Sequence, residues 1–341
     1  MTRLARSALA WGLASAAVSA TLIRYKTYKA ERENPPRGQF IDADGVRLHY
    51  IERGLGIPLV MLHGSETTAQ DFEWSGLMQI ACRRFRAIVF DRRGFGHSLR
   101  PRGRAWSAPA QAALLHHAIK RLGVEKPIVL GHSWGALIAL EYALQFPDEV
   151  RSLVLLSGLY YPSRHLNPPL AAMHAIPVLG EIMRYTVSPW LGRAMWRRRM
   201  RRAFAPRKVT GSAHRIPAWM MLRPSHLRAA AAENALTIPS ALSLMRRYAQ
   251  IKVPLHIVVG DADRFSDVAQ SERLHRDTPG SHLHTIRGAG HMIHHVAPDE
   301  VLAAIDHAAG PSPGPSPLME DASKVVAQIP TGGDMFKRLK E

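Results

Sequence analysis

The stretch that decides the fold is PIVLGHSWGALIALEYALQF, residues 127–146. Its first residues form a short apolar run typical of a buried strand, and its second half has the pattern of a helix. Between the two lies the motif GHSWG, centred on Ser133. A serine at this point is either the N-cap of the helix or a nucleophile held on a sharp turn, where small neighbours avoid a clash. The stretch alone leaves both interpretations open.

Similar runs recur between about Phe40 and Ala309. PLVMLHG, RAIVFDRRG, RSLVLLSG and PLHIVVGD are short and apolar, GVRLHYIERG alternates, and SHLHTIRGAGH is weaker. Helical patterns lie between them, among them PAQAALLHHAIKRLG, VAQSERLHRDT and DEVLAAIDHAA. Strand and helix in alternation predict an α/β fold with a doubly wound, mostly parallel sheet. Since ligands bind at the carboxyl ends of the strands in such sheets, the residues that follow each run are the candidates for a site.

The alternation stops over residues 159–250, which contain nine prolines and no clear strand. We therefore expect an inserted all-helical segment. The tail GPSPGPSPLMEDASKVVAQIPTGGDMFKRLKE begins with a Pro/Gly/Ser run and predicts disorder. The expected organisation is an N-terminal apolar anchor with a basic linker (1–33), two parts of one α/β core (34–158 and 251–310), the helical insertion (159–250) and the tail (311–341).

A nucleophilic serine needs a base, and His291 is the candidate. The chain has 18 histidines, so position must distinguish among them. His291 lies in IRGAGHMIHH, in the loop after the last predicted strand, where Gly288 and Gly290 permit close approach. His294 and His295 follow three and four residues later and are the weaker alternatives.

The base in turn needs a carboxylate from another strand end. VVGDADRFSD offers Asp261, Asp263 and Asp267, whereas the loop after LVLLSG offers no acidic residue. Asp263 is the preferred candidate because 28 residues separate it from His291, which leaves room for one helix and one strand. Asp261 is the alternative and is otherwise a turn residue.

An acyl-transfer site also needs donors for an oxyanion, usually backbone N–H groups. We expect one from Trp134, which follows the serine, and one from Ser65 in the loop after VMLHG. His63, Gly64 and His132 are expected to support these loops, with His63 more a structural histidine than a catalytic one. The motif FDRRGFGHSLRP, residues 90–101, is interpreted as architecture near the site.

The motifs LHGS, FDRRGFGHS, GHSWG, VVGDAD and GAGHMIHH, in this order, resemble those of the α/β-hydrolase superfamily, in its capped subgroup. The resemblance covers about residues 40–309 and implies that residues 160–250 form a cap over the active site. Haloalkane dehalogenases and epoxide hydrolases look similar around DRRGFGHS but carry aspartate at the elbow. The serine here therefore implies an acyl-enzyme formed at a carbonyl.

That chemistry fits a carboxylic ester, thioester or lactone, and it needs neither a metal nor an organic cofactor. The alternatives that remain open are amide or C–C bond hydrolysis, a perhydrolase or haloperoxidase-like activity, and a non-hydrolytic ligand-binding member of the fold. The expected substrate is a small molecule with an apolar acyl or aryl group. This expectation rests on apolar residues of the insertion, although such residues more often form a core: Met173, Ile176, Met183, Met195, Trp196, Trp219, Met220 and Met221.

The net charge limits the classes of binding partner, and the cysteine content limits the possible disulfides. The formal net charge is +18, and arginines concentrate in WRRRMRRAFAPRK, residues 196–208. A field of this sign attracts anionic partners, but no nucleic-acid-binding motif accompanies it, so we expect a solvated or membrane-facing surface and no nucleic acid. The single cysteine, Cys82, excludes an internal disulfide and is expected to be a buried core thiol.

The N-terminal residues 7–23 are uncharged and are flanked by arginine and lysine on both sides. Seventeen such residues lie at the short limit for a membrane span. We expect an uncleaved anchor in a bacterial-type inner membrane, with membrane association reinforced by the basic cap. The alternatives are a signal peptide cleaved after VSA, residues 18–20, which would give a secreted or periplasmic protein, and a soluble amphipathic helix.

Overall fold

The computed structural model describes residues 2–101, 103–163, 176 and 178–310. The predicted tail at 311–341, and Met173 among the apolar residues of the insertion, therefore lie outside the described residues. The described chain contains one sheet of eight strands in the order β1-β2-β4-β3-β5-β6-β7-β8. The strands are β1 (Gln39–Ala43), β2 (Val46–Arg53), β3 (Ile57–Leu62), β4 (Phe85–Phe90), β5 (Ile128–His132), β6 (Ser152–Leu156), β7 (Leu255–Gly260) and β8 (His282–Ile286).

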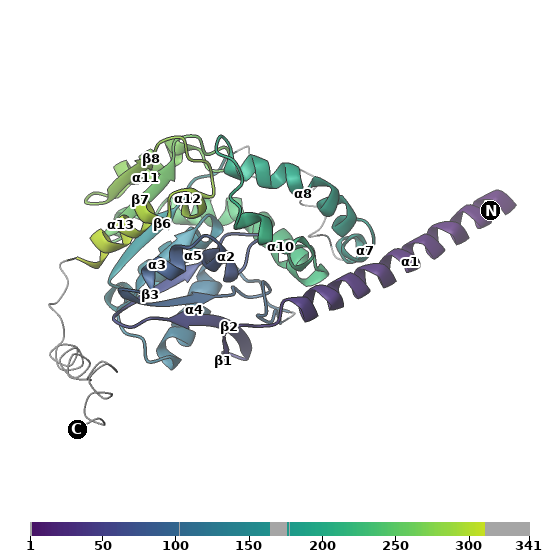
Figure 1. The fold of residues 1–341 in the computed structure, drawn as a ribbon, viewed down its shortest axis with the longest axis horizontal. Helices are drawn as coiled ribbons and strands as arrows, with labels where there is room; N and C mark the ends of the chain where they lie inside the picture. Colours follow the sequence, from purple (N-terminus) through teal and green to yellow (C-terminus); the bar gives the residue numbers. More distant parts are fainter. Residues whose placement is uncertain (1, 102, 164–175, 177, 311–341) are drawn as a thin grey trace, which may run out of the picture. The chain divides into compact units, whose positions relative to one another are not determined.

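The sheet is parallel from β4 through β8, and β2 joins β4 in antiparallel fashion, with β1 antiparallel to β2 at the edge. This confirms the doubly wound α/β fold, which Figure 1 shows with helices packed around the sheet. The strand β1 is the one not predicted, because most of its residues are exposed and form no apolar run.

Burial on both faces of the sheet explains why the central strands are apolar throughout. Alternate residues such as Val60 and Leu62 of β3 pack into the large core cluster together with helices α4 and α5. The intervening Leu59 and Met61 are equally buried against the opposite side. A strand that is covered on both faces needs apolar side chains at every position, and this is the pattern that the sequence carries.

Helices flank these strands, and some of them were not predicted from the sequence. The flanking helices are α2 (Gln70–Trp74), α3 (Leu77–Ala81), α4 (Ala108–Arg121), α5 (Trp134–Gln145), α11 (Val268–Asp277), α12 (Ile293–Val296) and α13 (Pro298–Ala309), with a 3-10 turn η1 (Pro147–Glu149). The start of α11 is fixed by a local contact, because the Asp267 side chain accepts a hydrogen bond from the Ala269 N–H and so caps the helix.

Between β6 and β7 the described residues form only helices, as predicted for the insertion. They are α7 (Leu179–Thr186), α8 (Ser188–Phe204), η2 (Ala213–Arg215), α9 (Ala218–Met221), α10 (Pro224–Leu244) and η3 (Tyr248–Gln250). Several of the prolines begin helices instead of interrupting them. Pro189 and Pro224 lie in the first turns of α8 and α10, where the missing N–H has no intrahelical partner to lose.

The N-terminal helix α1 (Arg3–Glu33) has two parts with different surroundings. Residues 2–15 are all exposed, whereas Ile23 and Ala30 are buried. The Ser19 hydroxyl donates to the Thr186 carbonyl at 2.6 Å and accepts from the Trp190 indole at 2.9 Å. The second half of α1 is thus packed on α7 and α8. By length and composition, α1 is the one helix among the described residues that could cross a membrane.

The prediction for Cys82 was wrong. The residue lies at the C-terminal end of α3 and is only partly buried, with its thiol near the Gln79 carbonyl at 3.3 Å. Cys82 is the C-cap residue that follows α3, whereas Leu77, Met78 and Ala81 supply the buried face of the helix.

Candidate active site

Ser133 stands at the junction of β5 and α5 in a rare backbone conformation, with φ 53° and ψ −117°. Its two glycine neighbours make this turn possible. A Cβ on Gly131 would lie 2.4 Å from the Gly135 carbonyl oxygen, and one on Gly135 would lie 2.5 Å from the Leu62 carbonyl oxygen. The Ser133 side chain makes no capping hydrogen bond to α5. Ser133 is therefore the N-cap of α5 by position only, and its hydroxyl is available to other partners.

The partner of Ser133 is His291. The distance from Ser133 Oγ to His291 Nε2 is 3.0 Å, and His291 Nδ1 lies 2.9 Å from Asp263 Oδ2. The three side chains come from the loops after β5, β7 and β8, which meet at the carboxyl edge of the sheet. The structure therefore brings together all three residues that the sequence nominated for a catalytic triad.

Asp263 is held as a carboxylate. Its Oδ1 accepts from the backbone N–H groups of Phe265 and Ser266 at 2.8 and 3.0 Å, and its Oδ2 accepts from the Ser266 hydroxyl at 2.9 Å. Burial alone would raise the pKa of Asp263, but the His291 imidazole and these donors outweigh it and hold the pKa below its usual value. A carboxylate in this state can orient an imidazole and stabilise its protonated form.

The loop that carries His291 is fixed by the helical insertion. The Ala203 carbonyl, in the last turn of α8, accepts from the His291 N–H at 3.0 Å. A Cβ on Gly290 would lie 2.2 Å from the Ala205 carbonyl oxygen, so glycine is required for this approach. Asp261, the alternative acid, accepts instead from the Gly288 N–H at 2.7 Å and shapes the same loop.

His294 and His295 were the alternative bases, and the structure assigns them to another cluster. Both are buried in or next to α12, and their Nε2 atoms lie 2.9 and 2.8 Å from the two oxygens of Asp71. Burial alone would raise the pKa of Asp71, but the two imidazoles hold it well below its usual value. The sequence analysis missed Asp71, since α2 gives no signal that its acid faces a segment more than 200 residues away.

His132 links this cluster to the triad. Its Nε2 lies 3.0 Å from the His291 carbonyl oxygen, and its ring packs 4.9 Å from that of His291 and 4.5 Å from that of His294. Burial and the neighbouring imidazoles hold the pKa of His132 well below its usual value, so the ring is neutral and donates to the carbonyl. His132 thus contacts the loop that carries His291.

The loop after β3 approaches Ser133 closely. A Cβ on Gly64 would lie 3.1 Å from the Ser133 Cβ and 3.0 Å from His132 Nδ1. Ser65 follows directly. Trp134 is the first residue of α5, and the first N–H groups of a helix have no intrahelical acceptor. The two backbone segments expected to supply oxyanion donors thus flank the serine.

His63 has a structural place. Its Nε2 accepts from the Arg92 N–H at 2.9 Å, and its Nδ1 lies 2.8 Å from the Gly64 carbonyl oxygen. Burial first, and the charge of Arg92 second, lower the pKa of His63 to about 4. The ring is therefore neutral at pH 7 and connects β4 to the loop of Gly64.

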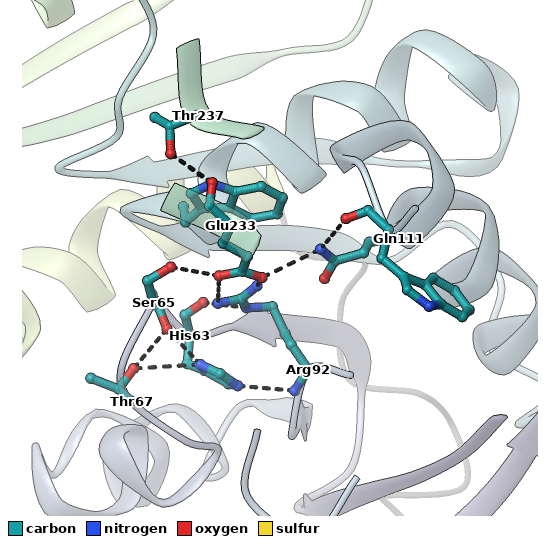
Figure 2. A network of polar contacts seen from close by, with 10 residues as sticks. His63, Ser65, Thr67, Arg92, Gln111, Glu233 and Thr237 are labelled. Atoms are coloured by element: carbon teal, nitrogen blue, oxygen red, sulfur yellow. Dashed lines mark hydrogen bonds and ion pairs between the residues drawn. The ribbon is translucent and has the colours of Figure 1, made fainter. Parts of the chain in front are cut away.

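Figure 2 shows a buried network that sequence reasoning missed. Glu233, on α10 of the insertion, forms an ion pair with Arg92 and accepts from the Ser65 hydroxyl at 2.5 Å. Gln111 on α4 donates to the same carboxylate at 3.3 Å, and the Trp134 indole donates to the Glu233 carbonyl at 3.2 Å. Both Glu233 and Arg92 are buried. The insertion is thereby bound to the loop after β3, to the turn after β4 and to the start of α5.

The motif FDRRGFGHS is architectural, as expected. The Asp91 carboxylate meets His49 Nδ1 at 2.7 Å and accepts from the N–H groups of Ala69 and His97 at 2.7 and 3.0 Å. A Cβ on Gly96 would fall 2.0 Å from this carboxylate. The turn after β4 is therefore wound around Asp91, and none of these contacts involves the triad.

The apolar residues of the insertion divide into core and surface. Met220 and Met221 are buried in a cluster with Phe204 and with Met292, next to His291. Ile176 and Met195 are exposed. Beside the triad, Phe265 packs its ring 5.2 Å from that of His291 and is 37% exposed. Asp263 and Phe265 also line a hollow that opens at this point.

Comparison with known proteins shows the family to which the fold belongs. The family described as the alpha/beta hydrolase fold matches residues 57–298, which is more than half of the chain. The chain therefore belongs to the alpha/beta hydrolase family, and the proteins similar to it include hydrolases of several reaction types.

Three relatives illustrate that range. Haloalkane dehalogenase 2 of Mycobacterium tuberculosis is 29% identical over 289 residues, which cover 80% of this chain and 94% of the relative. Epoxide hydrolase 3 of Siraitia grosvenorii is 25% identical and covers 78% of this chain and 95% of its own. The solved structure of a thermophilic esterase from Thermogutta terrifontis superposes with a TM-score of 0.62 at 25% identity, over 79% of this chain and 97% of the esterase.

Proposed function

We propose that this protein is a serine hydrolase that cleaves a carboxylic ester, thioester or lactone through an acyl-enzyme. The observation that carries the proposal is the continuous chain from Ser133 Oγ through His291 to the Asp263 carboxylate, at 3.0 and 2.9 Å. Nucleophile and base within hydrogen-bond reach, with the base oriented by a third group, is the arrangement that activates a serine.

In the proposed mechanism His291 Nε2 takes the proton of Ser133 while Oγ attacks the substrate carbonyl carbon. The carbonyl π electrons move onto oxygen, and the backbone N–H groups of Ser65 and Trp134 stabilise that oxyanion. Asp263 stabilises the imidazolium. The imidazolium then protonates the leaving oxygen or sulfur as its bond to the acyl carbon breaks. A water molecule, deprotonated by His291, releases the acid and restores Ser133.

The serine separates this reaction from those of the similar dehalogenase and epoxide hydrolase. Displacement at a saturated carbon uses a carboxylate at the elbow to form an alkyl ester. Residue 133 is a serine, and the one carboxylate of the triad, Asp263, is already bound to His291 and Ser266. A hydroxyl activated by a histidine favours attack on a carbonyl instead. Haloalkane and epoxide turnover are therefore the competing outcomes to test.

We propose an apolar acyl or aryl substrate taken up near a membrane. Phe265 offers partly exposed ring surface beside His291. Large apolar side chains are exposed on α1 and on the α7–α8 side of the insertion, which contact each other: Leu4, Leu9, Trp11, Leu13, Val18 and Leu22, and then Val178, Leu179, Ile182, Val187, Trp190 and Leu191. Many exposed apolar side chains on neighbouring elements favour membrane or partner contact.

The deciding experiment combines a Ser133→Ala variant with a panel of p-nitrophenyl esters of increasing acyl length. We expect the wild-type chain to turn over one or more of these esters and to be labelled by a fluorophosphonate. The variant should lose the labelling and at least about a thousandfold of the turnover, since only oxyanion and binding effects remain. Thermal unfolding of both proteins controls for folding.

Three outcomes would contradict the proposal. Residual ester turnover in Ser133→Ala equal to wild type would remove the serine from the mechanism. Halide release from a haloalkane, or diol formation from an epoxide, at rates above those for esters would assign another reaction. A single-turnover burst with a ligand that stays bound would instead indicate a non-hydrolytic binding protein.

A further inference from the structure

Three histidines from three separate elements lie close together at the amino ends of β7 and β8, whereas Ser133 follows the carboxyl end of β5. His256 is the second residue of β7 and His282 the first of β8, and the two are register partners in the parallel pair. His307, near the end of α13, completes the group. The rings of His256 and His282 stack at 4.8 Å, and His307 stands edge-on to both at 5.1 and 4.9 Å.

The donor atoms of this cluster are close and accessible. One imidazole nitrogen from each ring lies within 4.8 Å of the other two. His256 is buried, so its ring is held in place by its surroundings, whereas His282 and His307 are exposed. A ligand could therefore reach the nitrogens from solvent, and a water molecule could complete its coordination.

These imidazoles differ from most of the others in the described part of the chain. None of the three makes a side-chain hydrogen bond or ion pair there. In contrast, most of the other histidines of the body have a carboxylate within hydrogen-bond distance, namely His49, His116, His117, His284, His291, His294 and His295. A group of three rings with free nitrogens and no acidic partner is arranged for a cation that binds neutral imidazole.

The chemistry of the donors selects the ion. Imidazole nitrogen suits zinc, copper and nickel, whereas magnesium and calcium prefer oxygen. In a tetrahedral zinc site the Zn–N bonds of about 2.0–2.1 Å require the nitrogens to lie roughly 3.3 Å apart. The rotation of two exposed side chains can supply that contraction. We propose that His256, His282 and His307 form a surface binding site for a zinc-type divalent transition-metal ion, with water in the remaining position.

The location gives the site a consequence. The ion would join β7, the edge strand β8 and α13 at the amino ends of the strands. The carboxyl ends of the same two strands lead to Asp263 and His291. Binding would therefore stabilise the strand pair that positions two residues of the triad, without touching the substrate site.

The other cluster of similar composition has a different environment. Asp71, His294 and His295 also lie within 4.8 Å of one another, but all three are buried. Both Nε2 atoms already contact the Asp71 carboxylate, which satisfies the charge and the donors. An ion would have to break these contacts and enter a closed core. Zinc should therefore bind at the surface cluster and not at this one.

The test is calorimetric titration of ZnCl₂ into the full chain, free of any affinity tag, in detergent and after treatment with a chelator. We expect one ion per chain. His282→Ala and His307→Ala should each weaken binding by at least tenfold, because even the loss of a residue that only orients a ligand costs about 10–100-fold. Zinc should also raise the thermal unfolding midpoint of the wild type and not that of the two variants.

Controls make the result specific. His284→Ala removes a histidine of the same strand that pairs with Glu300, and it should leave zinc binding unchanged. MgCl₂ should give no binding heat. Since His282 and His307 are exposed, their variants should keep the wild-type unfolding midpoint without metal. The proposal fails if zinc does not bind, if binding survives both alanine variants, or if Asp71→Asn abolishes it.

Discussion

At the scale of single residues, the conformation of Ser133 depends on what its neighbours lack. A non-glycine residue at φ 53° and ψ −117° is strained by about 1–3 kcal/mol, so the surrounding structure must hold it there. The two motif glycines allow the backbones of β3, β5 and α5 to approach closely enough to do so. The strained turn directs the hydroxyl toward His291.

This argument predicts the effect of Gly135→Ala. The added Cβ would lie 2.5 Å from the Leu62 carbonyl oxygen, and a backbone atom cannot move aside easily. We expect a loss of about 1–3 kcal/mol or more in the free energy of unfolding, measured by urea denaturation. Gly211→Ala is the matched control, since its Cβ would meet nothing within 4 Å, and it should change stability by less than about 0.5 kcal/mol. Equal effects of the two changes would contradict the close-approach argument.

A second prediction at this scale concerns pH. The pKa of His63 falls from 6.5 in the unfolded chain to about 4 in the fold. Between these values the unfolded state binds the extra proton, so stability rises with pH and is lost as pH falls from about 6.5 towards 4. For His63 this amounts to on the order of 3 kcal/mol.

The measurement is the free energy of unfolding at intervals from pH 7.5 to 4.5. His63→Gln should flatten its dependence on pH, although the buried neutral rings of His132 and His226 keep part of the slope. His214→Gln, at an exposed position, is the control and should retain the wild-type slope. An unchanged slope in His63→Gln would show that His63 is not the group that titrates.

At the scale of elements, α10 is attached to the core through a buried charge. The Glu233 carboxylate faces the Arg92 guanidinium, and both side chains are at most 2% exposed. Truncating one partner of such a pair leaves an uncompensated buried charge, which costs more than the pair itself contributes.

Glu233→Gln should therefore lower the free energy of unfolding by about 3–5 kcal/mol. Glu33→Gln removes the partner of Lys29 in an exposed pair at 3.6 Å, and it should cost less than about 1 kcal/mol. Chemical denaturation of both variants gives the comparison. A small loss for Glu233→Gln would show that the carboxylate does not anchor α10.

The elements also explain what the sequence could predict. The strands β3 to β7 carry apolar runs because both faces are covered, and Ser133, Asp263 and His291 could be found because each follows a strand. Glu233 and Asp71 could not be found. Their partners lie 141 residues away for Arg92 and 223 for His294, and nothing in the pattern of α10 or α2 marks which helix positions face them.

At the scale of the whole molecule, charge and apolar surface lie on the same elements. The net charge is +18, and exposed arginines of α8 contribute to it: Arg193, Arg197, Arg198, Arg201 and Arg202. The same helix begins beside the exposed apolar residues of α7 and contacts α1 through Trp190 and Ser19. A surface of this kind suits an anionic lipid bilayer, where basic residues near the headgroups each contribute about 1 kcal/mol.

Ionic strength should distinguish the apolar contribution of α1 to membrane binding from the electrostatic contribution of the arginines. The full chain should sediment with anionic vesicles at both low and high ionic strength, because the first part of α1 binds through apolar burial. A variant lacking residues 2–15 removes only exposed positions and keeps Ser19 and Ile23, so its body should fold. It should bind the same vesicles at low salt and be released near 1 M, where the screening length is only about 3 Å.

Vesicles of neutral lipid provide the control, since they should retain the full chain and not the shortened variant. Two results would overturn this arrangement. If the full chain stays in solution with every vesicle, α1 does not enter the bilayer. The second result is that the shortened variant binds neutral lipid at 1 M salt as tightly as it binds anionic lipid at low salt. In that case the apolar side chains of α7 and α8, and not the arginines of α8, hold the body on the membrane.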